Sequence, residues 1–374
     1  MTQLTTTTAQ VRPYLAGNDY CPLRLREYQG IGGYLSNLPE HFVVHERALF
    51  LPDGSGEHTY ILLQKKGDTT TYAINALSKA LGISPRDIGY AGRKDRHAIT
   101  TQWMSVPVEV PESIVLPDSM SVLVARRHSR KLKLGNLKGN RFNIYLSDIT
   151  QDDQLLYQHI EALNNGVPNY FGRQRFGKLF STVASEDDPQ VNHMKDNVDR
   201  ALDLLHRPKQ RVRDPKMLLS ALQSALFNLW VGERISDGLF SQVIEGDVCR
   251  KIGGGTFTSD NPIEDSQRLK RGEIDILGPL VGKKMFPTKG YAKEREEALF
   301  HRWGIDEALR SILPKFWRGE RRVMSIRPEK LTWNRSDGGI WLNFSLPKGA
   351  YATTLLTELY QGEEPFERRR SVPD

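Results

Sequence analysis

The chain is poor in cysteine. Cys21 and Cys249 are the only two among 374 residues, and they lie far apart in the sequence. They offer neither a disulfide framework nor the closely spaced thiolates of a structural zinc site. We therefore expect a reducing compartment, because structural disulfides are typical of oxidising ones.

Long hydrophobic runs are missing as well. No stretch approaches the roughly 18 apolar residues that a membrane-spanning helix needs. The Thr-rich start, residues 1–28, lacks the charged stretch and following apolar run of a secretory signal, and it shows no sustained period. The sequence therefore predicts no membrane association, a cytoplasmic location, and a loosely ordered leader over residues 1–28.

Several catalytic patterns are absent or incomplete. There is no Gly-x-Ser-x-Gly segment and no cysteine near a histidine, which disfavours acyl transfer. Gly172, Gly177 and Lys178 have the spacing of a phosphate-binding loop, but Leu179 stands where Ser or Thr must hold magnesium. His97 has no acidic cluster beside it. Neither nucleotide hydrolysis nor a metal site is predicted.

Basic residues are in excess. The chain has 52 Lys and Arg against 45 Asp and Glu, which gives a net charge of +7 at pH 7. This balance favours an anionic partner, with nucleic acid first. Apolar residues make up 39% and charged residues 26%, as in globular proteins. Because 374 residues exceed the length at which single cores stop growing, we expect two domains.

Periodicity indicates strands and a helix in the first part of the chain. The segments "HFVVHE" (41–46) and "HTYILLQKK" (58–66) read as strands, and the turn residues between them predict that the two pair. A helix follows, ending at Gly82, with one apolar face. That face consists of Ala73, Ala76, Leu77, Ala80 and Leu81.

The character of the chain changes near residue 167, where longer helices begin. One helix follows Asp214, its predicted cap, and carries an apolar stripe of Leu218, Leu222, Ala225, Leu226 and Leu229. Strand-type residues return near 326, and a helix starts at about 352. We therefore predict a first domain over 29–166, an inserted domain over 167–320, and a return to the first domain's sheet over 321–374.

The stretch 126–141 contains seven Lys or Arg residues and no acid, interleaved with Gly135 and Gly139. Glycines let a backbone approach a ligand, and the cations can neutralise phosphates. A solvated charge run explains the pattern equally well. Phe142 follows directly, and an aromatic ring beside a basic groove can stack on an unpaired base. Its alternation with Ile144 and Leu146 is explained more simply by a core position.

Asp95 lies in "GYAGRKDRHAITTQW" (89–103), on a loop between two predicted strands. Arg93, Lys94, Arg96 and His97 surround it in the sequence. It can be an ordinary surface acid paired with its neighbours. A carboxylate among cations also stays ionised, and carboxylates attack sugar carbons in glycosyl transfer. A single acid argues against the usual two-acid hydrolysis of a glycoside, whereas an isomerisation that uses its own leaving group needs only one.

Six segments in order resemble the TruD family of tRNA pseudouridine(13) synthases, over residues 30 to about 360. They are "GYAGRKDRHAITTQW", "KLKLGNLKGNRF", "GVPNYFGRQRFG", "SALFN", "GPLVG" and "LPKGAYATTLLTEL". The resemblance implies an α+β fold: a pseudouridine synthase catalytic domain, with a mixed, largely antiparallel sheet flanked by helices, and an inserted α/β TRUD domain. It implies isomerisation of uridine 13 in the tRNA D-arm to pseudouridine, without metal or cofactor.

By this resemblance Asp95 is the catalytic aspartate, and Phe142 is the ring that stacks on the uracil. Asn140 supplies a neighbouring polar contact, and Phe42 and Tyr351 line the pocket. Many relatives carry a basic residue at the position of Ser36, so Ser36 is left out of the site. Six residues are expected to contact RNA phosphates: Arg93, Lys94, Arg130, Lys131, Lys133 and Lys138. Arg173 and Arg175 are assigned to a hinge between domains or to RNA contact.

The partner that the resemblance implies is tRNA, and nothing in the sequence demands a protein partner, so a monomer is expected. The alternative function is a non-catalytic tRNA-binding protein or RNA chaperone on the same scaffold, which needs the cations but not Asp95. A metal-dependent RNA nuclease is a second alternative, and the absence of clustered acids in the sequence disfavours it.

Overall fold

A computed structural model describes residues 14–16, 18–36, 38–177, 196–206, 212, 214–305, 307, 310, 317–336 and 338–361. The chain divides into two compact units. Unit 1 comprises the described parts of Met1–Gln29, Val167–Ile326 and Thr353–Gln361. Unit 2 comprises those of Gly30–Gly166 and Arg327–Ala352.

Composition predicts a loosely ordered leader over residues 1–28, but the described residues of that stretch belong to unit 1. Tyr14 and Cys21 are buried there. The backbone N–H groups of Arg24 and Leu25 donate to the carboxylate of Glu358, each at 2.9 Å. Glu358, from late in the sequence, holds this segment, so the composition of residues 1–28 alone does not indicate that part of the stretch is ordered.

Unit 2 is built on a nine-stranded sheet. Its order is β14-β15-β7-β2-β5-β3-β6, with β1 beside β7 and β4 beside β5. All pairs are antiparallel except β2 with β5. The strands are β1 (Tyr34–Leu35), β2 (Phe42–Ala48), β3 (His58–Lys66), β4 (Gly89–Tyr90), β5 (Ile99–Val106), β6 (Met120–His128), β7 (Leu137–Ser147), β14 (Glu329–Ser336) and β15 (Gly339–Pro347).

The predicted pairing of β2 with β3 is wrong. Each of these strands pairs with β5, which lies between them. The turn residues after β2 would permit a hairpin, but they do not decide which strand becomes the neighbour. Pairing with β5 is a long-range contact, made only after the chain has passed through α1 and β4.

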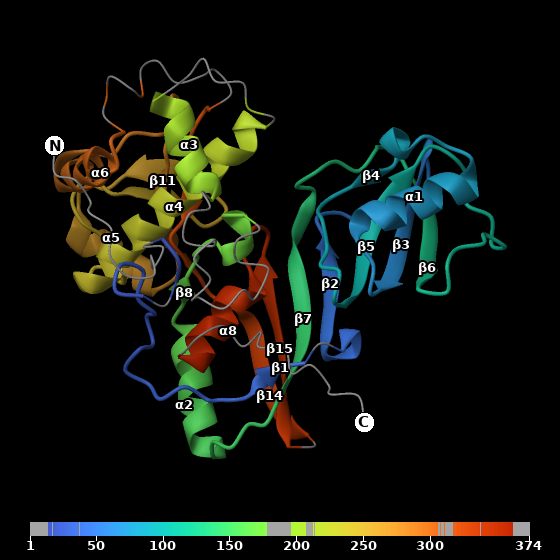
Figure 1. Cartoon of the computed structure of the whole chain (residues 1–374), viewed down its shortest axis with the longest axis horizontal. Coiled ribbons are helices and arrows are strands. Elements are labelled where there is room, and N and C mark those ends of the chain that lie inside the picture. Colours follow the sequence, from blue (N-terminus) through green and yellow to red (C-terminus); the bar gives the residue numbers. More distant parts are fainter. Residues whose placement is uncertain are drawn as a thin grey trace, which may run out of the picture. The chain divides into compact units, whose positions relative to one another are not determined.

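Helix α1 (Thr70–Leu81) forms as predicted and covers part of this sheet (Figure 1). The Thr69 side chain accepts the N–H of Tyr72, and Gly82 ends the helix with a left-handed φ of 63°. Ala73 and Leu77 are fully buried in one cluster with Ile61 and Leu63 of β3. The 3₁₀ turns η1 (Pro39–His41) and η2 (Pro85–Asp87) and helix α2 (Asp153–Asn164) complete unit 2.

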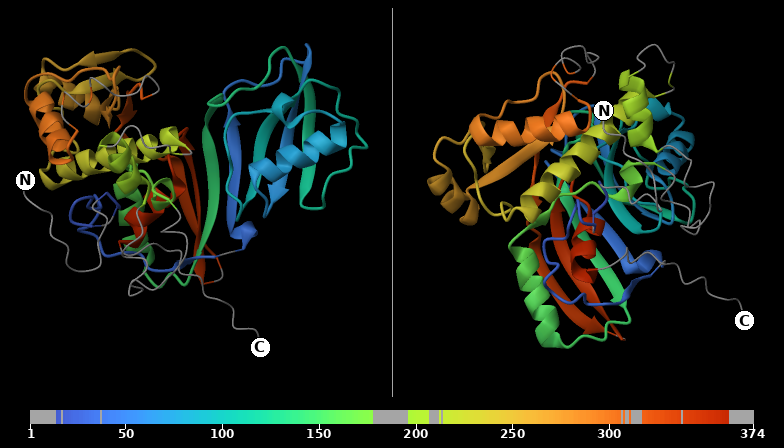
Figure 2. Two further views of the ribbon diagram at one scale, coloured as in Figure 1. Left: turned by 45° about the horizontal axis from the view of Figure 1, so that its top comes forward. Right: turned by 60° about the vertical axis from the view of Figure 1, so that its left-hand side comes forward.

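Unit 1 is organised around α4 (Pro215–Ser236), which lies against β11 and α3 (Figure 2). Asp214 caps this helix as predicted, since its side chain accepts the N–H of Met217. All five residues of the predicted apolar stripe are buried. The other elements are β8 (Val167–Pro168), η3 (Arg173–Arg175), α3 (Asn197–His206), β9 (Val248–Lys251), β10 (Thr256–Thr258), α5 (Pro262–Lys270), β11 (Ile274–Leu280), α6 (Gly290–Arg302), β12 (Glu320–Val323), β13 (Ser325–Ile326) and α8 (Ala352–Tyr360).

The strands of unit 1 form a four-stranded sheet of order β10-β9-β11-β12 and a pair of β13 with β8. Within the part of the chain that the structure describes, no helix is both long and apolar enough to cross a membrane.

Gly139 lets β7 and β15 come together. A Cβ at this position would lie 2.0 Å from the carbonyl oxygen of Leu346. The position of Gly139 in the basic stretch indicates approach to a ligand, but the backbone that approaches is that of β15. Gly135 has another role, because its φ of +85° is in the left-handed region that a turn uses.

We predict that Gly139→Ala lowers the free energy of unfolding by about 1–3 kcal/mol, because the methyl group must push β15 away. Urea denaturation measures the change. Gly92→Ala is the matched control, since its Cβ would be 3.7 Å from the nearest atom. Equal losses in the two variants would show that contact with β15 is not the cause.

Candidate active site

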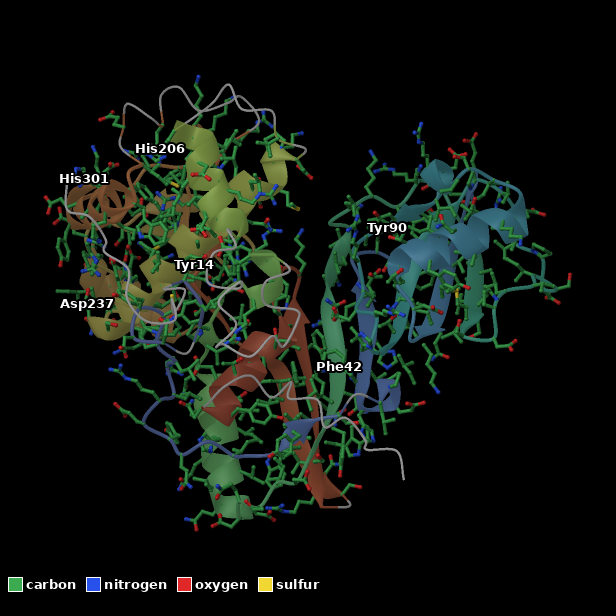
Figure 3. The ribbon with its side chains drawn as sticks, viewed as in Figure 1. Tyr14, Phe42, Tyr90, His206, Asp237 and His301 are labelled. Carbon is green, nitrogen blue, oxygen red and sulfur yellow. The ribbon has the colours of Figure 1, made fainter. Side chains whose placement is uncertain are left out.

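Asp95 lies on the loop between β4 and β5, as the sequence predicted. Its side chain is exposed, and no other described residue donates a hydrogen bond to its carboxylate or forms an ion pair with it. The segment before it contains Tyr90 on β4 (Figure 3). The carboxylate is therefore available to a substrate. Because it makes no such contacts, other groups must hold the loop that carries it.

Buried polar side chains hold this loop from several elements. The ammonium of Lys65, on β3, donates to the backbone oxygens of Asp95 (2.8 Å) and Asp68 (2.6 Å). Thr70, at the start of α1, accepts the N–H of Lys94 (2.9 Å) and donates to Gln102 Oε1 (3.1 Å). Gln102 Nε2 in turn donates to the oxygen of Gly92 (3.4 Å). Lys65, Thr70 and Gln102 are all buried.

Lys94 is the fourth anchor. Its Nζ lies 2.6 Å from Glu46 Oε2 of β2, and the two side chains are only 4% and 1% exposed. The other carboxylate oxygen of Glu46 accepts the N–H of Trp103 (3.2 Å). The expected contact of Lys94 with an RNA phosphate does not fit this position, because its ammonium is enclosed in an ion pair. Which charged side chains of a loop are buried cannot be predicted from the sequence, because a loop has no regular period.

Burial and charge act on Asp95 in opposite directions. Loss of hydration raises the pKa of its carboxyl, and Lys65, Lys94 and His97 lower it, in that order. The net direction is upward, so the protein crowded around this carboxyl outweighs the cations. The sequence predicts that the cations next to Asp95 in the chain keep it ionised. The strongest of the charges comes instead from Lys65, 30 residues earlier.

The strand register brings Phe42, Asn140 and Phe142, three of the four predicted pocket residues, to one face of the sheet. Phe142 and Thr100 both lie opposite Val44 of β2, and Thr100 lies opposite Lys65. Paired residues point to one face. In the next row Asn140 lies opposite Glu46, the partner of Lys94. Asn140 and Phe142 are therefore near neighbours of the anchors that hold the Asp95 loop.

The aromatic residues form an apolar wall on this face. Phe142 is stacked on Phe344 (ring centroids 5.3 Å apart, planes at 24°) and meets Phe42 edge to face (6.3 Å, 79°). Figure 3 places Phe42 at the start of β2. Phe142 is only 5% exposed, so in this structure the ring is a core residue. Tyr351 is half-buried, just before α8.

Asn140 has an unsatisfied acceptor. Its Oδ1 atom is buried and accepts no hydrogen bond from the described residues. Leaving such an atom unpaired costs about 1–3 kcal/mol, so buried polar atoms of this kind are rare and often explained by a ligand. Asn140 is the residue for which the family resemblance implied a polar contact with the substrate.

The predicted phosphate contacts differ in their surroundings. Arg93, Arg130, Lys133 and Lys138 are exposed. Lys131 is half-buried, and its Nζ donates to the backbone oxygen of Arg86 (2.8 Å). In unit 1, Arg175 donates to the hydroxyls of Ser220 and Ser224 on α4, and Arg173 is half-buried.

The segment that resembled a phosphate-binding loop forms the short 3₁₀ turn η3, and Lys178 lies outside the described residues. Among the residues that are described, no three His, Cys, Asp or Glu side chains gather closely enough to hold a metal ion.

Lys65, Glu46 and Gln102 are not predicted as site residues from the sequence. A signal for two of them was present, because alternation along a strand also applies to charged residues. Lys65 follows Ile61 and Leu63 on the inward face of β3, and Glu46 follows Phe42 and Val44 on that of β2. A charge in phase with buried apolar residues predicts a buried, partnered ion.

Known proteins are similar to this chain over most of its length. A family model described as tRNA pseudouridine synthase D (TruD) matches residues 22–183 and 190–359. The chain is 37% identical to the tRNA pseudouridine synthase D of Anaeromyxobacter sp. (strain Fw109-5), over 90% of this chain and 95% of that protein. It is 35% identical to the enzyme of that name from Aliivibrio fischeri (strain MJ11), over 91% and 95%.

A solved structure is also similar. It is a Methanosarcina mazei protein described as a candidate tRNA pseudouridine synthase D (TruD), which matches with a TM-score of 0.70 and 25% identity. The match covers 93% of this chain and 97% of that one. With the nine-stranded, largely antiparallel sheet, it confirms the predicted α+β fold.

We predict that Lys94→Met lowers the free energy of unfolding by about 3–5 kcal/mol, because it leaves the Glu46 carboxylate buried without a partner. Adding Glu46→Gln should recover part of that loss. Urea denaturation of both single variants and the double variant measures the coupling.

The exposed pair of Lys66 and Glu40 is the matched control, with side chains 55% and 48% exposed. The same two substitutions there should give a much smaller coupling. Equal coupling at the two pairs would contradict the assignment of Lys94 as a buried structural ion.

Proposed function

Because the chain belongs to the tRNA pseudouridine synthase D (TruD) family, we propose that it isomerises a uridine of tRNA to pseudouridine. We place the reaction at position 13 of the D-arm and assign Asp95 as the nucleophile. We expect it to proceed in the cytoplasm, on a monomer, without metal or cofactor.

The observation that carries the proposal is the state of Asp95. Its carboxylate is exposed and has no partner from another described side chain, while buried groups fix its loop to β2, β3, β5 and α1. A reactive group held in place while its functional atoms remain free is what catalysis by positioning requires. A purely RNA-binding protein has no use for such an acid.

In the proposed reaction the uridine leaves its stack, which costs a few kcal/mol. The Asp95 carboxylate attacks C1′ and the N1–C1′ bond breaks, or the carboxylate assists formation of a glycal. The freed uracil turns, and C5 bonds to C1′ as the carboxylate leaves. C5 then loses its proton and N1 gains one, so the product is an isomer of the substrate and no co-reactant is needed.

Asn140 and the aromatic wall fit a uracil ring. The unpaired Oδ1 of Asn140 can accept the N3–H of uracil, which would satisfy both atoms. Phe42 and Phe142 offer apolar surface beside it. Since Phe142 is 5% exposed, stacking on its face requires the ring to become more accessible when RNA binds. Tyr351 stays in the proposed pocket on the resemblance alone.

The exposed cations are the proposed phosphate contacts: Arg93, Arg130, Lys133 and Lys138. Lys131 is kept with them, although its ammonium already donates to Arg86. Lys94 is removed from this set because of its ion pair with Glu46.

We predict that Asp95→Asn abolishes product formation and leaves tRNA affinity nearly unchanged, because the amide is a poor nucleophile of almost the same shape. Tritium release from tRNA labelled at uridine C5, with a chelator present, measures the reaction. Asp87→Asn, at an exposed acid of the same unit, is the control and should stay active. Tight tRNA binding without release by the unmodified protein would favour the non-catalytic binder.

We predict that Lys133→Ala weakens binding to all tRNAs and reduces the slope of log affinity against log salt by about 1, because one phosphate contact is lost. Filter binding at several salt concentrations measures the slope. Lys79→Ala removes an exposed charge from α1 and should leave the slope unchanged. An unchanged slope for Lys133→Ala would contradict a phosphate contact at Lys133 and would indicate that the basic stretch 126–141 is an ordinary solvated surface.

A further inference from the structure

Lys65 is a buried lysine that the proposed mechanism does not use. It is 0% exposed, and among the described residues it forms no ion pair within 4.0 Å. Its ammonium donates to two backbone oxygens, those of Asp68 and Asp95. An ammonium taken out of water without a carboxylate partner is costly, so a lysine in this setting calls for a functional explanation.

We propose that Lys65 is a positioning residue for the reaction at Asp95: its ammonium fixes the backbone of the Asp95 loop and places a fixed positive charge beside the Asp95 carboxylate. This proposal rests on the proposed function. It goes beyond that function because it assigns a role to a side chain that cannot reach the RNA.

The first part of the role is geometric. The two oxygens that Lys65 binds belong to separate segments, the turn before α1 and the loop before β5. One ammonium therefore ties both segments to β3, which is hydrogen-bonded to β5 on one side and β6 on the other. Next to it the N–H of Gly67 donates to the oxygen of Ala98 (3.2 Å), which joins the same two segments. Small displacements of a nucleophile have large effects on rate, and 1 Å can cost on the order of 10²-fold.

The second part is electrostatic. Asp95, Asp68 and Lys94 face Lys65, while Lys65, Lys94 and His97 face Asp95, and Glu46 partly neutralises Lys94. The charge of Lys65 lowers the pKa of Asp95 against the effect of burial, and so favours the ionised nucleophile. Burial lowers the pKa of Lys65 itself to about 8, against the opposite pull of Asp95 and Asp68.

The two shifts predict a bell-shaped dependence on pH. Below the raised pKa of Asp95 the nucleophile is protonated and inactive. Above about pH 8 Lys65 loses its proton, and its neutral amine holds the backbone oxygens of Asp68 and Asp95 less strongly, so the nucleophile is less well positioned. The active form, ionised Asp95 beside protonated Lys65, exists between these limits.

The test is the single-turnover rate of tritium release as a function of pH, together with tRNA affinity, for the unmodified protein and Lys65→Met. We expect the variant to react on the order of 10²-fold more slowly at its optimum, with affinity changed less than twofold, because Lys65 is buried away from RNA. Its acid limb should move to higher pH, since Asp95 loses its strongest favourable charge, and the alkaline limb near pH 8 should vanish.

Lys66→Met is the matched control. It changes the same residue type at the next position of β3, where the side chain is 55% exposed and paired with Glu40. Its rate and both limbs should equal those of the unmodified protein. A residue that only stabilises the fold would change the folded fraction without moving either limb, so unmoved limbs in Lys65→Met overturn the proposal.

The unmodified protein supplies a second measurement if Lys65→Met does not fold. A group with a pKa of about 8 is mostly deprotonated at pH 9, so the rate should fall about tenfold between pH 7 and 9 while tRNA stays bound. A rate that is constant over this range overturns the role of Lys65. No release from the unmodified protein at any pH would instead overturn the proposed function, and this role with it.

Discussion

The contact between the Lys65 ammonium and the backbone of Asp95 is the constraint on which the rest of the site depends. The loop between β4 and β5, which carries Asp95, is not part of a strand. It therefore lacks the backbone hydrogen bonds of the sheet, and side chains must fix its position. Lys65, Thr70, Gln102 and the pair of Lys94 with Glu46 provide it, each from a different element. Because these polar groups lie largely out of contact with water, the loss of one would leave the hydrogen-bonding atoms of its partners unpaired.

The same burial sets the electrostatics. Protein packed close to the exposed Asp95 side chain removes part of its hydration, and that loss raises the pKa of its carboxyl more than the nearby cations lower it. A nucleophile that is less well solvated reacts more readily once it is ionised. The partial loss of hydration and the positive charges that favour ionisation therefore both serve the proposed reaction. The buried cations Lys65 and Lys94 are engaged within the protein, whereas the exposed cations are the proposed contacts for RNA phosphates.

Much of the fold could be predicted from periodicity, because burial repeats along one element. Helix α1 with its Gly82 end, helix α4 with its Asp214 cap, and the loop position of Asp95 were all recognisable in this way. The pairing of β2 with β3 was predicted wrongly, since the interposed strand β5 comes from later in the chain. The roles of Lys94 and Gly139 were misjudged for the same reason: their partners, Glu46 and Leu346, are distant in sequence.

The sequence by itself determined the elements, the basic excess, the family resemblance and the choice of Asp95 as the acid of interest. These depend on local spacing or on the order of motifs, which a single chain displays directly. Only the tertiary structure decided which cations are buried and which face solvent, that Asn140 keeps an unpaired acceptor, and that Lys65 lies behind Asp95. The physical reason is that hydration and Coulomb interactions depend on distance in space, and strand order brings together residues that the sequence separates.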